Sequence, residues 1–145
     1  MSNGAFAQRG MEFAPRARKV LLVDEDASDL RIYCLALEGQ GFDIRTCTSY
    51  DAGIQCLETE PYDFVLVSQG SHAFEGRTVI DRALQLDRYR PVLVVTRSTD
   101  IPCYLEAMQM GAIDYLEKPV AGSDLLRFVR AHVANAKFKA GGAAA

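Results

Sequence analysis

The chain has 145 residues, of which 49% are hydrophobic and 24% charged. This balance is typical of one globular domain rather than of a disordered or fibrous protein. Its 16 basic and 19 acidic side chains leave a net charge of −3, which argues against direct binding of nucleic acid. The apolar runs are far shorter than the roughly 20 residues that cross a bilayer, and the N-terminus lacks the apolar stretch of a secretory signal. We therefore expect a cytoplasmic protein that does not contact a membrane.

The cysteines follow no metal-binding pattern. The sequence contains no Cys-x-x-Cys pair, and each cysteine lies among apolar neighbours in an expected helix or strand: Cys34, Cys47, Cys56 and Cys103. We favour buried thiols in a reducing compartment over disulfides or a metal site.

The first half of the chain alternates short apolar runs, which predict strands, with segments of helical spacing. Small and polar residues without period occupy 1–17 and predict a flexible tail. Gly39 and Gly41 end the first expected helix, and Ser49 is the expected cap of the second. In chain order, the expected elements are a strand at 19–23, a helix at 30–37, a strand at 43–48, a helix at 52–57 and a strand at 63–67.

The second half continues the alternation after a loop of small and polar residues at 68–76. Pro91 precedes an expected strand, and Gly111 closes an expected helix. In chain order, the expected elements are a helix at 79–86, a strand at 92–96, a helix at 101–110, a strand at 113–117 and an amphipathic helix at 124–136. We thus expect a globular domain at 18–136 and a linker at 137–145.

Five strands alternating with five helices predict an α/β fold, a doubly wound parallel sheet of five strands with helices on both faces. Binding sites in such sheets lie at the carboxyl ends of the strands. The polar residues that end or follow a strand there are Asp24, Glu25, Ser68, Thr96 and Lys118. We expect them to gather at one edge of the sheet.

This ordered set resembles the receiver domain of two-component response regulators, and the resemblance covers residues 19 to about 135. Its markers are Val23-Asp24-Glu25, Tyr62 to Val67, Glu75-Gly76, Val95-Thr96 and Gly111 to Pro119. The resemblance implies a flavodoxin-like sheet, a role in phosphorelay signal transduction, and no enzymatic activity. The switch and marker residues of the family correspond to Thr96, Tyr115, Lys118 and Pro119, and Pro119 is expected to follow a cis peptide bond.

The phosphoacceptor position departs from the family pattern. Receiver domains carry an aspartate there, which a histidine kinase phosphorylates, whereas this chain has Ser68, and Ser71-His72 replaces the usual Met-Pro. An aspartate with a pKa of about 3.9 is an ionised nucleophile at neutral pH, while a serine first needs a neighbouring base. Lys118 is a cation and cannot be that base. We therefore expect Ser68 not to be a receiver-type phosphoacceptor.

The metal site of the family is expected to be weak or vestigial. Mg²⁺ is often held by one or two carboxylates, and the remaining candidate ligands are Asp24, Glu25 and the backbone carbonyl of Gly70. Because the third carboxylate is absent, we favour an empty site over a weak Mg²⁺ site, and we expect no other cofactor. Lys118 is then expected to form an ion pair with Asp24 or Glu25.

We interpret the chain as an atypical receiver, a pseudo-receiver that acts through protein–protein interaction. The resemblance places the binding surface on the fourth helix, the fifth strand and the fifth helix, with Leu105, Met108 and Met110 as candidate anchors. The partner is a second copy in a homodimer or a separate protein, such as a histidine kinase or an output protein.

Two alternatives remain open. In the first, the domain is a functional receiver that is phosphorylated at Ser68 or at another non-standard residue. In the second, it is a flavodoxin-like protein that binds FMN. The loop after Val23 argues against FMN, because it is acidic and offers a phosphate neither glycines nor positive charge.

Overall fold

The structure is a computed structural model that describes the backbone of residues 16–144 and the side chains of residues 16–133. Most of the tail expected at 1–17 lies outside the described residues. Within them, no helix is both long enough and apolar enough to span a membrane.

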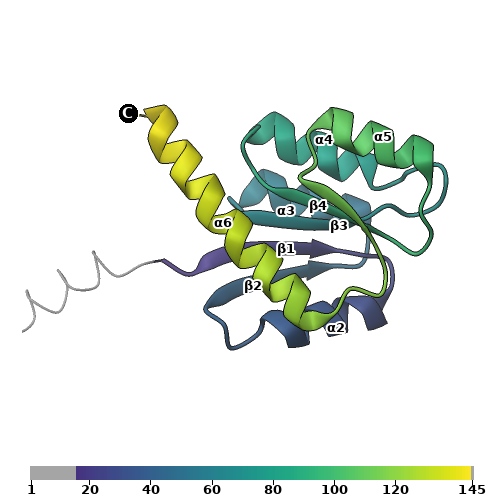
Figure 1. The fold of residues 1–145 in the computed structure, drawn as a ribbon, viewed down its shortest axis with the longest axis horizontal. Coiled ribbons are helices and arrows are strands. Elements are labelled where there is room, and N and C mark those ends of the chain that lie inside the picture. The colour runs from purple at the N-terminus through teal and green to yellow at the C-terminus, as the bar shows by residue number, and fades with distance from the viewer. Residues whose placement is uncertain (1–15, 145) are drawn as a thin grey trace, which may run out of the picture.

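Five parallel strands form one sheet in the order β2-β1-β3-β4-β5 (Figure 1). In chain order, they are β1 (Arg18–Val23), β2 (Phe42–Cys47), β3 (Phe64–Ser68), β4 (Val92–Thr96) and β5 (Asp114–Glu117). The chain first runs outward from β1 to the edge strand β2 and then returns across β1 to β3. The register pairs Val23 with Val67, so the residues that follow β1 and β3 lie side by side at the point where the strand order reverses, which is the usual binding position in such sheets.

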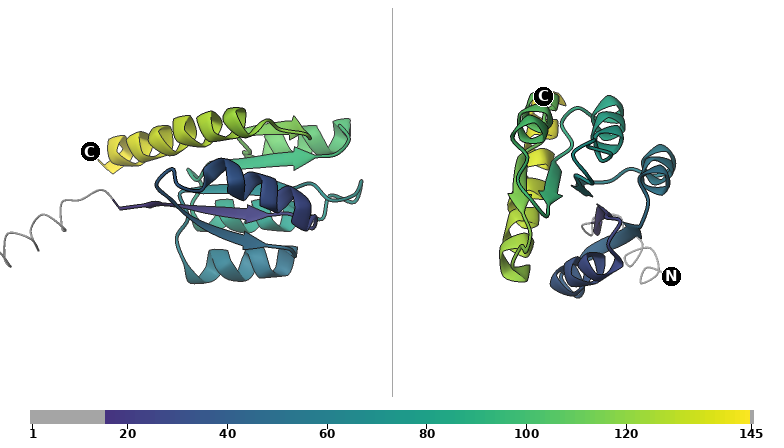
Figure 2. Two further views of the ribbon diagram at one scale, coloured as in Figure 1. Left: turned by 90° about the horizontal axis from the view of Figure 1, so that it is seen from below. Right: turned by 90° about the vertical axis from the view of Figure 1, so that its right-hand side faces the viewer.

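Five helices connect the strands and cover both faces of the sheet (Figure 2). One face packs against α2 (Ala27–Leu37) and α6 (Gly122–Ala144). The other face packs against α3 (Tyr50–Thr59), α4 (Arg77–Leu86) and α5 (Ile101–Met110). The predicted doubly wound α/β fold is thereby confirmed.

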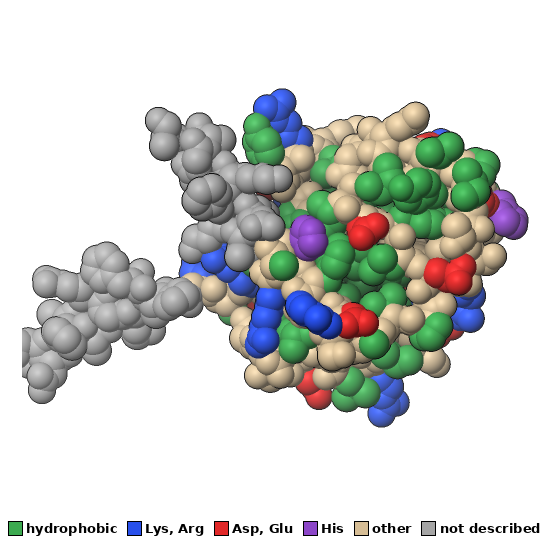
Figure 3. Space-filling model, in the orientation of Figure 1, with side chains coloured by type: hydrophobic (Ala, Val, Ile, Leu, Met, Phe, Trp, Pro, Cys, Tyr) green, Lys and Arg blue, Asp and Glu red, His purple; other side chains and the backbone are tan. Residues whose placement is uncertain are grey.

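Some large apolar side chains remain on the surface, and α5 carries the largest group of them. Figure 3 shows hydrophobic side chains gathered over α5 and between α5 and α6. The exposed large hydrophobic residues among the described ones are Ile32, Leu35, Leu86, Tyr89, Ile101, Tyr104 and Leu105.

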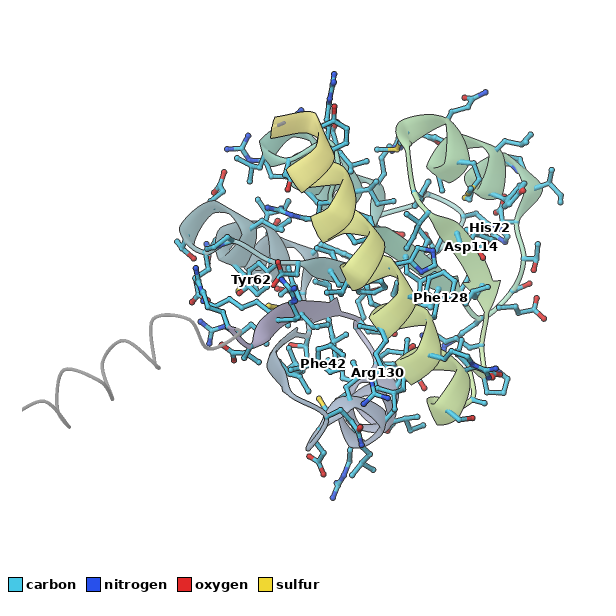
Figure 4. The ribbon with its side chains drawn as sticks, turned by 60° about the vertical axis from the view of Figure 1, so that its left-hand side comes forward. Phe42, Tyr62, His72, Asp114, Phe128 and Arg130 are labelled. Atoms are coloured by element: carbon cyan, nitrogen blue, oxygen red, sulfur yellow. The ribbon has the colours of Figure 1, made fainter. Side chains whose placement is uncertain are left out.

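The central strands are buried on both sides, because their alternate side chains point to opposite faces of the sheet. In β1, Leu22 packs toward α2 and α6, while Leu21 packs toward the other three helices. Phe128 of α6 points toward the sheet (Figure 4), where its ring meets Phe64 edge-on with the centroids 6.4 Å apart. Each fully buried side chain of this kind contributes about 1.5–3 kcal/mol to stability.

The observed elements differ from the expected ones by a few residues at their ends, and α6 differs more. This helix continues to Ala144, so the described part of segment 137–145 is helical, and its role as a linker stays a prediction. Residues 134–140 are rich in alanine and lysine, which favour helix. Once a helix has formed, each added residue brings a hydrogen bond without a new nucleation cost, and the helix therefore includes Gly141 and Gly142.

Candidate functional site

A pocket of about 300 Å³ opens at the carboxyl ends of the strands. Its lining residues are Asp24, Glu25, Asp26, Ser68, Gly70, Arg97 and Lys118. The structure therefore brings together five residues that the sequence singled out and adds Asp26 and Arg97. Thr96, Tyr115 and Pro119 are not part of the lining.

Asp24 is buried directly after β1, and the protein itself occupies both oxygens of its carboxylate. The backbone N–H of Asp26 donates to Oδ1 at 2.9 Å. The Tyr33 hydroxyl donates to Oδ2 at 3.1 Å, and Lys118 Nζ lies 2.8 Å from the same oxygen. Burial and the negative charge of Asp24 raise the pKa of Tyr33, so this hydroxyl remains a donor at physiological pH.

Lys118 follows β5 and lies between two carboxylates. Its Nζ is 2.8 Å from Asp24 Oδ2 and 2.8 Å from Asp29 Oδ2. The predicted ion pair with Asp24 is confirmed, whereas Asp29, in the first turn of α2, was not predicted. The peptide bond between Lys118 and Pro119 is cis, as expected.

Arg97 extends across the mouth of the pocket to the start of α2. Its guanidinium is paired with Asp26 and lies 3.7 Å from Asp29 Oδ2. Asp26 also caps α2, since its carboxylate accepts from the backbone N–H groups of Ser28 and Asp29. The hydrogen bond from Asp29 N–H, with Arg97 and other groups, lowers the pKa of Asp26. The sequence indicates the contact between Arg97 and Asp26 only weakly, through the position of a basic residue directly after the end of β4.

Ser68 ends β3 and lies in the pocket as a buried hydroxyl. Its Oγ accepts a hydrogen bond from the backbone N–H of Gly70 at 3.3 Å. Nearby, the Tyr50 hydroxyl donates to Glu25 Oε1 at 3.3 Å. Burial is the main cause that raises the pKa of Tyr50 to about 12. Ser68 thus lies among charged groups but carries no charge of its own.

Thr96 and Tyr115 lie outside the pocket. The Thr96 hydroxyl donates to the Ser98 carbonyl at 2.9 Å. The buried Tyr115 hydroxyl donates to Gln69 Oε1 and accepts from the backbone N–H of Asp100 at 3.1 Å. Gln69 was not predicted, and its buried position next to Ser68 connects Tyr115 to the loop after β3.

The residues present do not form a three-carboxylate Mg²⁺ site. Oxygen donors suit this hard cation, and Asp24, Glu25 and Gly70 do line one pocket. However, both oxygens of Asp24 are engaged by the protein, and Ser68 supplies no third carboxylate. In the part of the chain that the structure describes, no group of three His, Cys, Asp or Glu residues is arranged to hold a metal ion.

Residues 20–130 match the family model of the response regulator receiver domain. The chain belongs to this family. Among curated proteins, the alginate biosynthesis transcriptional regulatory protein AlgB of Pseudomonas aeruginosa is 28% identical over 107 residues, which are 74% of this chain and 24% of AlgB. The chain therefore spans about a quarter of the length of this relative.

Solved receiver domains share the fold. A response regulator receiver domain protein (CheY-like) from Methanospirillum hungatei JF-1 superposes with a TM-score of 0.79 at 22% identity, over 84% of this chain and 98% of that one. The signal receiver domain of a putative Luxo repressor protein from Vibrio parahaemolyticus gives a TM-score of 0.76 at 25% identity, over 84% and 94% of the two chains. The predicted receiver-type fold is confirmed.

Proposed function

We propose that this receiver domain accepts no phosphoryl group and acts in two-component signalling through contacts with another protein. The observation that carries the proposal is Ser68 at the end of β3, in the same pocket as Asp24 and Lys118. Receiver domains have their phosphorylated aspartate at the end of this strand.

The surroundings of Ser68 support the first half of the proposal. A serine hydroxyl becomes a nucleophile only when a base removes its proton. Lys118 is a cation held by Asp24 and Asp29, and His72, in the loop after Ser68, is paired with Asp100. A serine phosphate would also be a stable monoester without the lability of an acyl phosphate, and so a poor reversible signal.

We also propose that the pocket binds Mg²⁺ weakly at most. A cation would have to compete with Lys118 and Tyr33 for the carboxylate of Asp24. Only Glu25 and the carbonyl of Gly70 would complete the ligand set that the chain offers, and Mg²⁺ exchanges its hydration water reluctantly.

The proposed contact surface is the face formed by α5, β5 and α6. On α5, Ile101 is 61% exposed, Tyr104 38% and Leu105 52%, and contiguous exposed apolar side chains often mark interaction sites. Leu105 fits the expected role of an anchor. Met108 and Met110 do not, because both pack against the core beneath the helix.

The partner in this proposal is a second copy of the domain, a histidine kinase or an output protein. AlgB is named as a transcriptional regulatory protein, and any DNA binding would belong to such a partner or to a further region, since this chain has a net charge of −3. By analogy with the family, we place the domain in the cytoplasm and assign it no catalytic activity of its own.

Incubation with acetyl phosphate and Mg²⁺ tests the absence of phosphorylation. Intact-mass spectrometry at neutral pH should show no adduct with the mass of a phosphoryl group. The Ser68→Ala variant distinguishes the alternatives. An adduct that is lost in this variant would identify Ser68 as the acceptor, and an adduct that persists would identify another residue; either result would refute the proposal.

A further inference from the structure

Two thiols face each other where β2 ends and α3 covers the sheet. Cys47 is the last residue of β2, Cys56 lies in α3, and their Sγ atoms are 3.5 Å apart. We propose that this pair is a modification site at which a peroxide forms an intramolecular disulfide. The proposal rests on the thiol geometry and is independent of the phosphorylation state of Ser68.

The backbone on both sides holds the pair in place without a covalent link. Gly53 brings α3 close to β1, since a Cβ at this position would lie 2.8 Å from a methyl carbon of Val23. Cys56 is one turn further along α3 and so lies on the same face of the helix. On the strand, the carbonyl of Cys47 accepts a hydrogen bond from the backbone N–H of Asp24 at 3.1 Å. Both cysteines are thus pre-positioned, and a bond between them requires only a small movement of the side chains.

The two thiols differ in access. Cys47 is only 7% exposed, and burial, followed by its contact with Cys56, raises its pKa to about 12. Cys56 is half-buried and is therefore the thiol that a small oxidant reaches first. Arg45 precedes Cys47 by two residues in β2, so the two side chains point to the same face of the sheet.

A second pocket opens beside this region, between β2 and the end of α3. It has a volume of about 320 Å³, and its lining includes Arg45, Glu60 and Tyr62. Tyr62 is labelled in Figure 4. The backbone N–H of Glu60 donates to the carbonyl of Cys56 at 3.0 Å, so the pocket borders the turn of α3 that carries this cysteine. A molecule as small as hydrogen peroxide fits this space easily.

The reaction balances with one peroxide molecule. The Cys56 thiolate attacks an oxygen of hydrogen peroxide, the O–O bond breaks, and hydroxide leaves, which yields a sulfenic acid. The sulfur of Cys47, after loss of its proton, then attacks the Cys56 sulfur. The S–S bond forms, the S–O bond breaks, and a second hydroxide leaves. Each hydroxide takes up a thiol proton, so two thiols and one peroxide give one disulfide and two water molecules, with two electrons passing from sulfur to oxygen.

The disulfide would change the segment that supports Asp24 and Glu25 in the pocket at the strand ends. The disulfide would close a ring over residues 47–56, and this ring includes Tyr50, whose hydroxyl donates to Glu25. The carbonyl of Cys47 in the same ring holds the backbone of Asp24. Oxidation would therefore stiffen the support of both acids and give the domain a chemical input that does not involve residue 68.

Alkylation after oxidation of the full, folded chain tests the proposal. Of the four cysteines, two should resist alkylation after hydrogen peroxide treatment and denaturation, and dithiothreitol should restore all four. Chymotryptic cleavage after Tyr50 separates Cys47 from Cys56, so the disulfide should join two peptides that dithiothreitol releases. The Cys47→Ser and Cys56→Ser variants should lose this linked pair, while the matched Cys34→Ser and Cys103→Ser variants should retain it.

The peptide map of the chain without substitutions tests for the Cys47–Cys56 disulfide even if a serine variant fails to fold. Alkylation of all four cysteines after peroxide treatment would overturn the proposal. A disulfide that joins Cys34, Cys103 or a second copy of the chain, in place of the Cys47–Cys56 link, would overturn it as well.

Discussion

At the scale of single residues, the pocket is an ion-pair network in which acids and cations alternate. Lys118 lies between Asp24 and Asp29, and Arg97 lies between Asp29 and Asp26. Each cation thus contacts two carboxylates, and Asp29 is shared by both. Because Lys118 and Asp24 are largely buried, their contact is screened less by salt than an exposed pair, and removal of either partner would leave the other buried and unpaired.

Replacement of Ser68 by aspartate should turn the pocket into a better cation site. The new carboxylate would lie near Asp24 and Glu25, and the mutual repulsion of these groups is relieved by a divalent cation. We expect Mg²⁺ affinity to rise at least about tenfold, which corresponds to about 1.4 kcal/mol, as measured by isothermal titration calorimetry. Ser68→Asn, which adds a similar volume without charge, should leave the affinity unchanged. Equal affinity in Ser68→Asp and the parent chain would mean that Lys118 keeps Asp24 occupied.

Asp100 should stabilise the folded domain at neutral pH, and this contribution should be lost in acid. The hydrogen bond with His72, followed by that from the backbone N–H of Cys103, lowers the pKa of Asp100. A carboxyl with a lowered pKa in the folded state stabilises the protein above its unfolded pKa of about 3.9, and this contribution is lost as pH falls through the folded pKa. Thermal unfolding of Asp100→Asn should therefore depend less on pH below about pH 4, while asparagine still caps the helix. Identical acid dependence in both proteins would contradict this assignment.

Sequence reasoning predicted the contacts that follow from strand ends but not those that depend on side-chain reach. Lys118 and Asp24 were paired because both lie at the carboxyl edge of a parallel sheet. Asp29 and Tyr33 reach Lys118 and Asp24 only because of the direction in which α2 leaves β1, and no local pattern encodes that direction. The long side chain of Arg97 can reach several acids, so its partner could be identified only from the three-dimensional structure.

At the scale of elements, flanking residues decided how well the boundaries were predicted. The bounds of β4 and α5 were predicted as observed, because Pro91 and Gly111 mark their ends. Helix α6 has no such stop signal at its expected end, and its alanine-rich continuation extended the helix through the predicted linker. Short apolar runs located the buried strands β1, β3 and β4, whereas the edge strands β2 and β5 have mixed sequences and were placed by the alternation of strands and helices.

Gly53→Ala tests how closely α3 approaches the sheet. Alanine normally stabilises a helix by about 1 kcal/mol relative to glycine. At position 53, however, the added Cβ would lie 2.8 Å from Val23, and overpacking of a core typically costs about 1–3 kcal/mol. We therefore expect the midpoint of urea unfolding to fall, with Gln55→Ala on the exposed face of the same helix as a control that changes stability little. A rise in the midpoint for Gly53→Ala would show that α3 can move away from β1 without cost.

At the scale of the whole molecule, the two helical layers bury the sheet but each leaves apolar side chains on the surface. In one layer, α2 exposes Ile32 and Leu35, and in the other, α5 exposes Ile101 and Leu105. The order of strands and helices predicted the layers, because parallel strands require right-handed crossovers. It did not predict which side of α5 faces the solvent: of the three expected anchors, Leu105 is exposed, while Met108 and Met110 are partly buried and pack against the core.

The exposed apolar residues of α2 and α5 provide a matched test of the proposed contact surface. The double variant Ile101→Glu with Leu105→Glu should weaken self-association or partner binding at least about tenfold, as measured by sedimentation velocity over a range of concentrations. Ile32→Glu with Leu35→Glu places the same charges on the opposite layer and should have no effect, and neither should Ser68→Ala. Tyr115 is not a suitable probe, because its ring is buried and its hydroxyl is bonded to Gln69. If Ser68→Ala abolished association while the α5 variant had no effect, the hydroxyl would be the switch and the pseudo-receiver interpretation would be wrong.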